Sequence, residues 1–169
     1  MPWINALNRR YTIMTSQSKH NIVNIFNQRI GKANNERSWF SLENINYRKM
    51  QVDAYRAIIK CGPVFYSPVG GFGVIILHFH ANGAITKINA EVKPLKAGIW
   101  FAIGFAMLFS AVFLLIVPGT DKFLFLAFTW FIALGPVYLT ILIWRYRLTK
   151  YLKSVLIDIG VHENMVREQ

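Results

Sequence analysis

Residues 97–117 read AGIWFAIGFAMLFSAVFLLIV, and residues 123–144 read FLFLAFTWFIALGPVYLTILIW. Neither run contains a charged side chain. About 20 apolar residues in a helix are enough to cross the ~30 Å hydrocarbon layer of a bilayer. Two buried helices of a soluble protein would need a large surrounding core, which the rest of a 169-residue chain does not supply. We therefore expect two transmembrane helices.

The turn between the runs sets their topology. Five residues, PGTDK, join the two runs, so the helices form an antiparallel hairpin with both outer ends on one side of the membrane. Lys122 is the single Lys or Arg in this turn, out of 19 in the chain, and basic residues flank the outer ends of both runs. Because Lys and Arg accumulate on the cytoplasmic side, both termini are expected in the cytoplasm.

The first 35 residues contain five Lys and Arg and no acidic residue, a composition that mimics a mitochondrial transit peptide. A folded strand and helix is the competing interpretation of the same segment. Residues 11–15 alternate as a short strand does, and Ser16 or Ser18 can then cap a helix that ends at Gly31. The apolar residues of this helix recur at helical spacing: Ile22, Ile25, Phe26 and Ile30. The apolar runs begin too late for a secretory signal peptide.

Two short strands are expected next, at residues 38–47 and 54–61. In the second, one face carries Tyr55, Ala57, Ile59 and Cys61. Cys61 is the only cysteine, which excludes an intrachain disulfide and favours a buried core thiol in a reducing cytoplasm.

The dipeptide Asn82-Gly83 lies between two β-rich runs and predicts a β-hairpin with a type I′ turn. That turn would place Phe79 opposite Thr86 and His78 opposite Lys87. One face of the β-hairpin is then apolar and the other polar, which supports the pairing.

Two features of the same region resemble chemical sites. Gly70, Gly71 and Gly73 resemble a phosphate-binding loop, but a strand follows them where such a loop needs a helix, so we expect a turn or bulge. His78 and His80 share a face, but Lys87 opposes them and no third ligand is near. The acidic residues are scattered without pairing, so we expect no catalytic, metal or cofactor site and no enzyme activity.

The first apolar run carries a stripe of small residues at every fourth position: Gly98, Ala102, Ala106 and Ser110. Small residues let helices approach closely in lipid, so this stripe is expected to contact the second helix or another copy of the chain. Pro136 is expected to kink the second helix.

The net charge of +11 would suit nucleic acid, but much of it flanks the apolar runs, where topology and anionic lipids already account for it. Nucleic-acid binding is therefore unfavoured. The residues expected to contact anionic lipid are Lys93, Lys96, Arg145, Arg147, Lys150 and Lys153.

The order of parts resembles a group of small uncharacterised bacterial inner-membrane proteins. The pieces that carry the resemblance are the strand Tyr11-Thr12-Ile13-Met14-Thr15, the Ser-capped helix and NGAITKINAEVKP before the first apolar run. The segment YRAIIKCGPVFYSP departs from that group, which tends to have an Arg-Asn-Ser-type turn there. The resemblance implies a bacterial inner-membrane location and transfers no activity or site residue.

These patterns predict an α+β fold, in which a small antiparallel sheet with one covering helix is joined to a two-helix transmembrane hairpin. We expect a cytoplasmic domain at 1–94, the hairpin at 95–145 and a basic amphipathic tail at 146–169. The expected function is a membrane-tethered interaction or regulatory module, an accessory of a membrane assembly that binds a protein partner or its own copies. The alternative is a membrane-perturbing or pore-forming effector that oligomerises through its hairpin.

Overall fold

The computed structural model describes residues 6–35, 45–62, 72–82, 85–116, 119, 121–161 and 166–167. The chain divides into two compact units. The sheet unit comprises residues 1–94 and 144–169, and the hairpin unit comprises residues 95–143. The α+β class expected from the sequence is confirmed, with an antiparallel sheet, helices and a two-helix hairpin.

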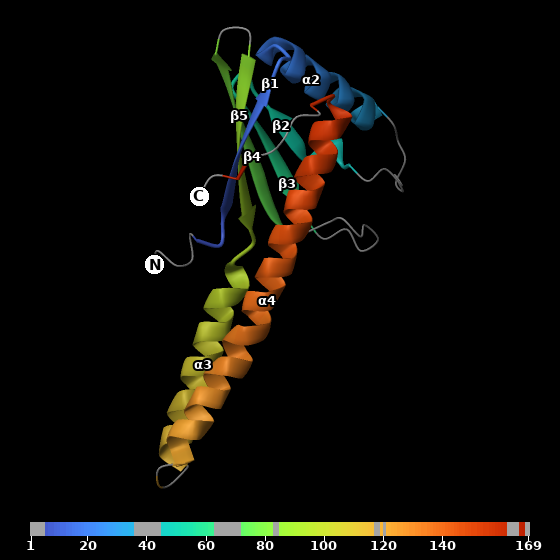
Figure 1. The fold of residues 1–169 in the computed structure, drawn as a ribbon. Coiled ribbons are helices and arrows are strands. Elements are labelled where there is room, and N and C mark those ends of the chain that lie inside the picture. The colour runs from blue at the N-terminus through green and yellow to red at the C-terminus, as the bar shows by residue number, and fades with distance from the viewer. Residues whose placement is uncertain are drawn as a thin grey trace. The chain divides into compact units, whose positions relative to one another are not determined.

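The strands pair in the order β2-β3-β4-β5-β1-β6, and each pairing is antiparallel (Figure 1). The N-terminal strand therefore lies beside β5, which is distant in sequence. The elements are β1 (Arg9–Thr15), α2 (Lys19–Asn35), the 3₁₀ turn η1 (Tyr47–Lys49), β2 (Met50–Val52), β3 (Arg56–Cys61), β4 (Gly73–Asn82), β5 (Ile85–Pro94), α3 (Ala97–Ile116), α4 (Asp121–Asp158) and β6 (Val166–Arg167).

One face of the sheet is apolar, and α2 and the last part of α4 cover it (Figure 1). Alternation along each strand sends every second side chain into this core, which is the period-2 pattern of a half-buried sheet. The fully buried side chains from the strands include Ile13, Ile59, Ile75, Leu77, Phe79 and Ile88. Those from the helices include Ile22, Phe26, Leu148, Leu152 and Ile159. The sheet thus has a second helical cover besides the expected α2.

Helix α2 begins where the sequence predicted and ends later. The Ser18 hydroxyl accepts a hydrogen bond from the Asn21 backbone N–H at 3.3 Å, so Ser18 is the cap. Gly31 was expected to end the helix, but α2 continues to Asn35. Gly31 has no positive φ, and Ala33 beyond it packs against the core, so tertiary contact extends the helix.

The β4–β5 pairing is shifted by two residues from the predicted register. Phe79 lies opposite Ile88, His80 lies opposite Lys87, and Asn82 pairs with Ile85. An even shift leaves every side chain on its predicted face, so the apolar pattern cannot distinguish the two registers. The predicted register was therefore wrong, although the β-hairpin itself and both of its faces are confirmed, and the turn type predicted at Asn82-Gly83 concerns a segment that lies partly outside the described residues.

Strand β3 also has the predicted faces, with Ala57 and Ile59 buried and Arg56 and Lys60 exposed. Tyr55, which was assigned to the apolar face, lies before the strand and is 72% exposed. Most of the strand expected at 38–47 lies outside the described residues, and Tyr47 itself belongs to the 3₁₀ turn.

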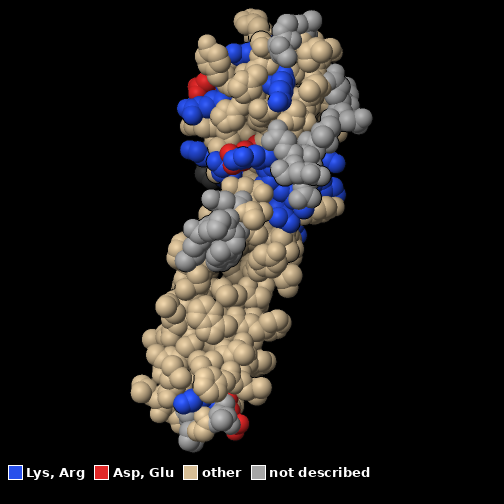
Figure 2. Space-filling view, turned by 60° about the vertical axis from the view of Figure 1, so that its left-hand side comes forward, with Lys and Arg blue, Asp and Glu red and all other residues tan. Residues whose placement is uncertain are grey.

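Helices α3 and α4 are both long and apolar enough to cross a membrane. Only 17% of the most apolar window of α3 and 11% of that of α4 are buried, whereas the core helix of a soluble protein is mostly buried. Figure 2 shows that the hairpin surface is almost free of Lys, Arg, Asp and Glu except near its turn. An apolar surface of this kind is suited to the hydrocarbon interior of a bilayer.

Helix α4 does not end with its apolar run. It continues through Pro136 without a break in helical structure and ends at Asp158, 38 residues in all. From Trp144 onward it belongs to the sheet unit, whereas the sequence division kept 146–169 as a separate tail. Leu148, Leu152 and Val155 recur at helical spacing and are fully buried, so this segment packs as core. Gly160, with φ 81°, closes the helix with a Schellman pattern, in which the Val161 N–H donates to the Leu156 carbonyl at 2.8 Å.

Gly73 begins β4 at a point of close backbone approach. A Cβ at this position would collide with the Lys93 carbonyl oxygen and would lie 2.9 Å from Pro94 Cα and 2.8 Å from Leu148 Cδ1. Gly70 and Gly71 lie outside the described residues. The role of Gly73 is thus to let β5 and α4 pack against the start of β4.

We expect Gly73→Ala to lower the free energy of unfolding by about 1–3 kcal/mol, because the backbone of β5 cannot move aside as a flexible side chain can. Gly31→Ala is the control: nothing lies within 4 Å of its added Cβ. In a helix interior that change should stabilise by about 0.5–1 kcal/mol. Urea unfolding of the full-length protein in detergent, followed by circular dichroism, measures both. Equal effects of the two substitutions would contradict the close-approach explanation.

Candidate functional site

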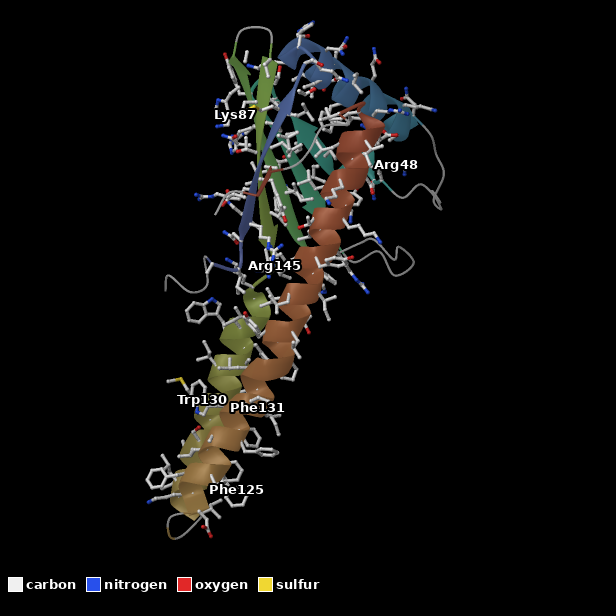
Figure 3. The ribbon with its side chains drawn as sticks, viewed as in Figure 1. Arg48, Lys87, Phe125, Trp130, Phe131 and Arg145 are labelled. Carbon is white, nitrogen blue, oxygen red and sulfur yellow. The ribbon has the colours of Figure 1, made fainter. Side chains whose placement is uncertain are left out.

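The second face of the sheet has no helical cover among the described residues, and we call it the open face. Its side chains alternate with those of the core along β1, β3, β4 and β5. The Lys and Arg residues on it are Arg10, Arg56, Lys60, Lys87 and Lys93, and Glu91 is the one acidic residue at these strand positions. Figure 3 shows Lys87 projecting from β5 on this side. The open face is therefore basic.

Ion pairs neutralise only part of this charge. Glu91 contacts both Lys93, at 2.9 Å, and Arg10, at 3.7 Å. Asp53, at the end of β2, contacts Arg56 at 3.1 Å. In the part of the chain that the structure describes, neither Lys60 nor Lys87 forms an ion pair. Their ammonium groups remain available to an anionic partner.

The two histidines project from the open face and are exposed. His78 lies between Arg56 and Asn89, and His80 lies opposite Lys87. Cations thus flank both imidazoles, although Lys87 opposes His80 rather than His78 as predicted. Among the described residues, no three His, Cys, Asp or Glu side chains come together as a metal site.

Three titratable groups lie on the covered side, of which Tyr47 and Tyr151 are buried and Cys61 is partly buried. Burial, followed by a 2.5 Å hydrogen bond to Asp158, raises the pKa of Tyr47. Burial likewise raises the pKa of Tyr151 to about 12. Burial raises the pKa of the Cys61 thiol to about 12, against a smaller opposing effect of Lys49. All three side chains are neutral at physiological pH, so the thiol is a packing group rather than a nucleophile.

The residues predicted to contact anionic lipid lie on different elements. Lys93 is paired with Glu91 on the open face, and Lys96 belongs to the hairpin unit. On α4, Arg147, Lys150 and Lys153 lie on the exposed side. Eight residues of continuous helix separate Arg145 from Lys153, which is about 12 Å along the axis. The set therefore extends along the helix.

Two polar residues that the sequence did not single out lie at the beginning of β1. Arg9 Nε and Asn8 Oδ1 are buried, and neither has a hydrogen-bond partner among the described residues. A buried polar atom without a partner is costly, so this position needs a further group. The sequence feature that could have identified this position is the pair Arg9-Arg10 at the start of β1. Because side chains alternate along a strand, the two guanidinium groups lie on opposite faces of the sheet.

The small-residue stripe lies inside the hairpin unit. Ala102 and Ala106 are 4% and 0% exposed, and Ser110 accepts a 3.1 Å hydrogen bond from Trp130 Nε1 of α4. A Cβ added to Gly98 would lie 3.5 Å from Val137 of α4. The stripe faces the second helix of the same chain, and Figure 3 shows Trp130 on α4.

Comparisons with known proteins add no assignment: no family model, no curated protein and no solved structure matches this chain.

The raised pKa values predict a pH dependence. Tyr47, Tyr151 and Cys61 keep their protons longer in the folded than in the unfolded chain, whose ordinary pKa values are 10.0 for Tyr and 9.0 for Cys. Stability is therefore complete below about pH 9 and falls as the pH rises toward the folded values. Urea unfolding in detergent between pH 7 and 11 measures this. Tyr47→Phe should make the decline above pH 10 shallower.

The matched control for that substitution is Tyr55→Phe. Tyr55 is 72% exposed, and its ring contact with Lys19 survives the change. Its decline should follow that of the unmodified protein. If both substitutions leave the slope unchanged, Tyr47 has no part in the alkaline transition.

Proposed function

We propose that this protein is a membrane-tethered interaction module. In this proposal the hairpin crosses the inner membrane of a bacterial cell, both termini lie in the cytoplasm, and the sheet unit binds a protein partner with an acidic surface. The observation that carries the proposal is the open face: a sheet of long strands whose second face is uncovered, with five Lys and Arg against one Glu. The bacterial location rests on the resemblance described above.

The tether is supported by two independent features. The exposed apolar surface of α3 and α4 needs lipid to cover it, as Leu115 and Phe101 illustrate with exposures of 88% and 80%. The distribution of charge adds the orientation, because Lys122 is the single basic residue of the turn. A sheet unit on the cytoplasmic side would then meet partners along the membrane surface.

The pore-forming alternative has weaker support. It would use the small-residue stripe between copies, but Ala102 and Ala106 are already buried within the hairpin unit of one chain. Oligomerisation through the stripe would have to break the contact of Ser110 with Trp130. No ionisable side chain lines the apolar part of either helix that could form a conducting path.

The topology is tested by a single cysteine at the turn. In a Cys61→Ser background, Thr120→Cys should react with a membrane-impermeant maleimide in intact cells. Asn34→Cys, at the end of α2, is the cytoplasmic control and should react only after lysis. Reaction of Asn34→Cys in intact cells would reverse the orientation, and reaction of neither position before lysis would remove the transmembrane hairpin from the proposal.

The open face is tested with an acidic probe. A fluorescent polyglutamate peptide should bind the full-length protein in detergent at about 0.1 M salt, where charges still interact over roughly 10 Å. Reversing two unpaired charges, with Lys60→Glu and Lys87→Glu together, should weaken binding about 5- to 30-fold, since each surface charge contributes up to about 1 kcal/mol.

The control reverses two exposed charges elsewhere on the sheet unit, with Lys150→Glu and Lys153→Glu on α4, and reaches the same net charge. An equal loss in both double variants would mean that the probe responds to net charge and not to the open face. If a duplex DNA probe binds more tightly than the peptide, the partner of the open face is nucleic acid and not an acidic protein. Absence of peptide binding to the unmodified protein would contradict the proposal.

A further inference from the structure

We infer that Arg9 and Arg145 form a binding site for the phosphate of an anionic lipid headgroup. The inference rests on the proposed membrane tether, and it adds a defined site to what was a diffuse attraction between basic residues and lipid. It concerns the end of the sheet unit at which both chain connections to the hairpin unit leave, after Pro94 and before Trp144. A lipid headgroup is the anion that a membrane tether would bring to this end.

The side chain of Arg9 lies on the covered face. Positions 9, 11, 13 and 15 of β1 share that face by alternation, and Tyr11, Ile13 and Thr15 are buried there. Val92, which is paired with Arg9, is fully buried on the same side. The guanidinium therefore extends from the edge of the apolar core toward α4, rather than into the solvent over the open face.

Strand β1 and the last part of α4 run in the same direction. Tyr11 contacts Thr149 through their hydroxyls at 3.2 Å, and six residues later Gln17 donates to the Gly160 carbonyl at 3.0 Å. Arg9 precedes Tyr11 by two residues, which is about 6.7 Å along the strand. Arg145 precedes Thr149 by four residues, which is about 6 Å along the helix. Because both steps run in the same direction and have nearly the same length, Arg9 and Arg145 lie at the same level along the strand and helix axes.

Other contacts place the same end of α4 against the sheet. The ring centroids of Phe72 and Trp144 lie 4.8 Å apart, and Leu148 lies beside Gly73. Figure 3 shows Arg145 on α4 beside this end of the strands. Trp144 and Tyr146 flank Arg145 in the sequence, and aromatic side chains of this kind favour the headgroup region of a bilayer.

The chemistry at this level calls for an anion. The Nε of Arg9 is a buried donor without an acceptor among the described residues, and Arg145 brings a second positive charge to the same level. A phosphate oxygen accepts from guanidinium N–H groups in a geometry that matches their planar fork. Phosphatidylglycerol is an anionic lipid that offers such a phosphate.

The test measures lipid retention by the full-length protein in nonionic detergent, with native mass spectrometry. The unmodified protein should retain phosphatidylglycerol over phosphatidylcholine of the same acyl chains. Arg9→Gln should weaken that retention about 10-fold or more, as expected for a lost charge-assisted hydrogen bond. Arg145→Gln should have a similar effect. Arg56→Gln, on the open face, removes the same charge and should change retention less than about twofold.

Each other outcome identifies what has failed. Equal effects of Arg9→Gln and Arg56→Gln in proteins with unchanged circular dichroism would overturn the site. If millimolar inorganic phosphate displaces the lipid, the site belongs to free phosphate, and the lipid assignment is wrong. Flotation with phosphatidylcholine vesicles tests the tether separately. If the protein floats with the vesicles but shows no selective lipid retention, only the phosphate site is contradicted. If the protein does not float, the proposed membrane tether is contradicted.

Discussion

The apolar face of the sheet must be covered, and the rest of the structure depends on how this is achieved. Helix α2 covers only part of the face, and the end of α4 supplies the remaining core with Leu148, Leu152, Val155 and Ile159. A β-sheet with one bare apolar face is not stable in water, because burial of apolar surface is the main favourable term in folding. The helix that provides this cover is the same helix that carries the second membrane-length run. The sheet unit is therefore complete only when the chain has passed through the hairpin.

This dependence also explains the two kinds of apolar pattern within α4. From Phe123 to about Ile143 the helix is apolar on all sides, and Leu124, Phe131 and Ile143 are exposed by half or more. Beyond Trp144 the apolar residues contract to one stripe, while Arg147, Lys150 and Lys153 occupy the other side. The first pattern suits lipid and the second suits a protein core with water opposite. The change in pattern occurs at the boundary between the two units, without any interruption of the helix.

Much of this architecture can be predicted from the sequence wherever a local pattern alone determines the structure. The Ser18 cap, the alternation of β3, the membrane-length helices and the stop at Gly160 all follow from residues within a few positions of each other. Prediction failed where distant contacts compete with the local rule. Strands β4 and β5 also pair with β3 and β1, and an even shift of the β4–β5 register preserves the apolar pattern. The end of α2 and the place of residues 146–161 depend on a core that the local sequence does not display.

The candidate sites show the same division. The composition revealed an excess of basic residues. Only the alternation of side chains along the strands shows which of these residues lie on the open face and which lie on the covered face. Arg10 and Lys93 both contact Glu91 on the open face, so part of the positive charge there is already paired. The contact of Arg10 with Glu91 also links β1 to β5. Lys60 and Lys87 add charge to that face without an ion pair among the described residues. Arg9 is adjacent to Arg10 in sequence and yet lies on the opposite face, beside the core. Charges on opposite faces of a sheet cannot meet the same ligand, so a net charge of +11 describes at least two different surfaces.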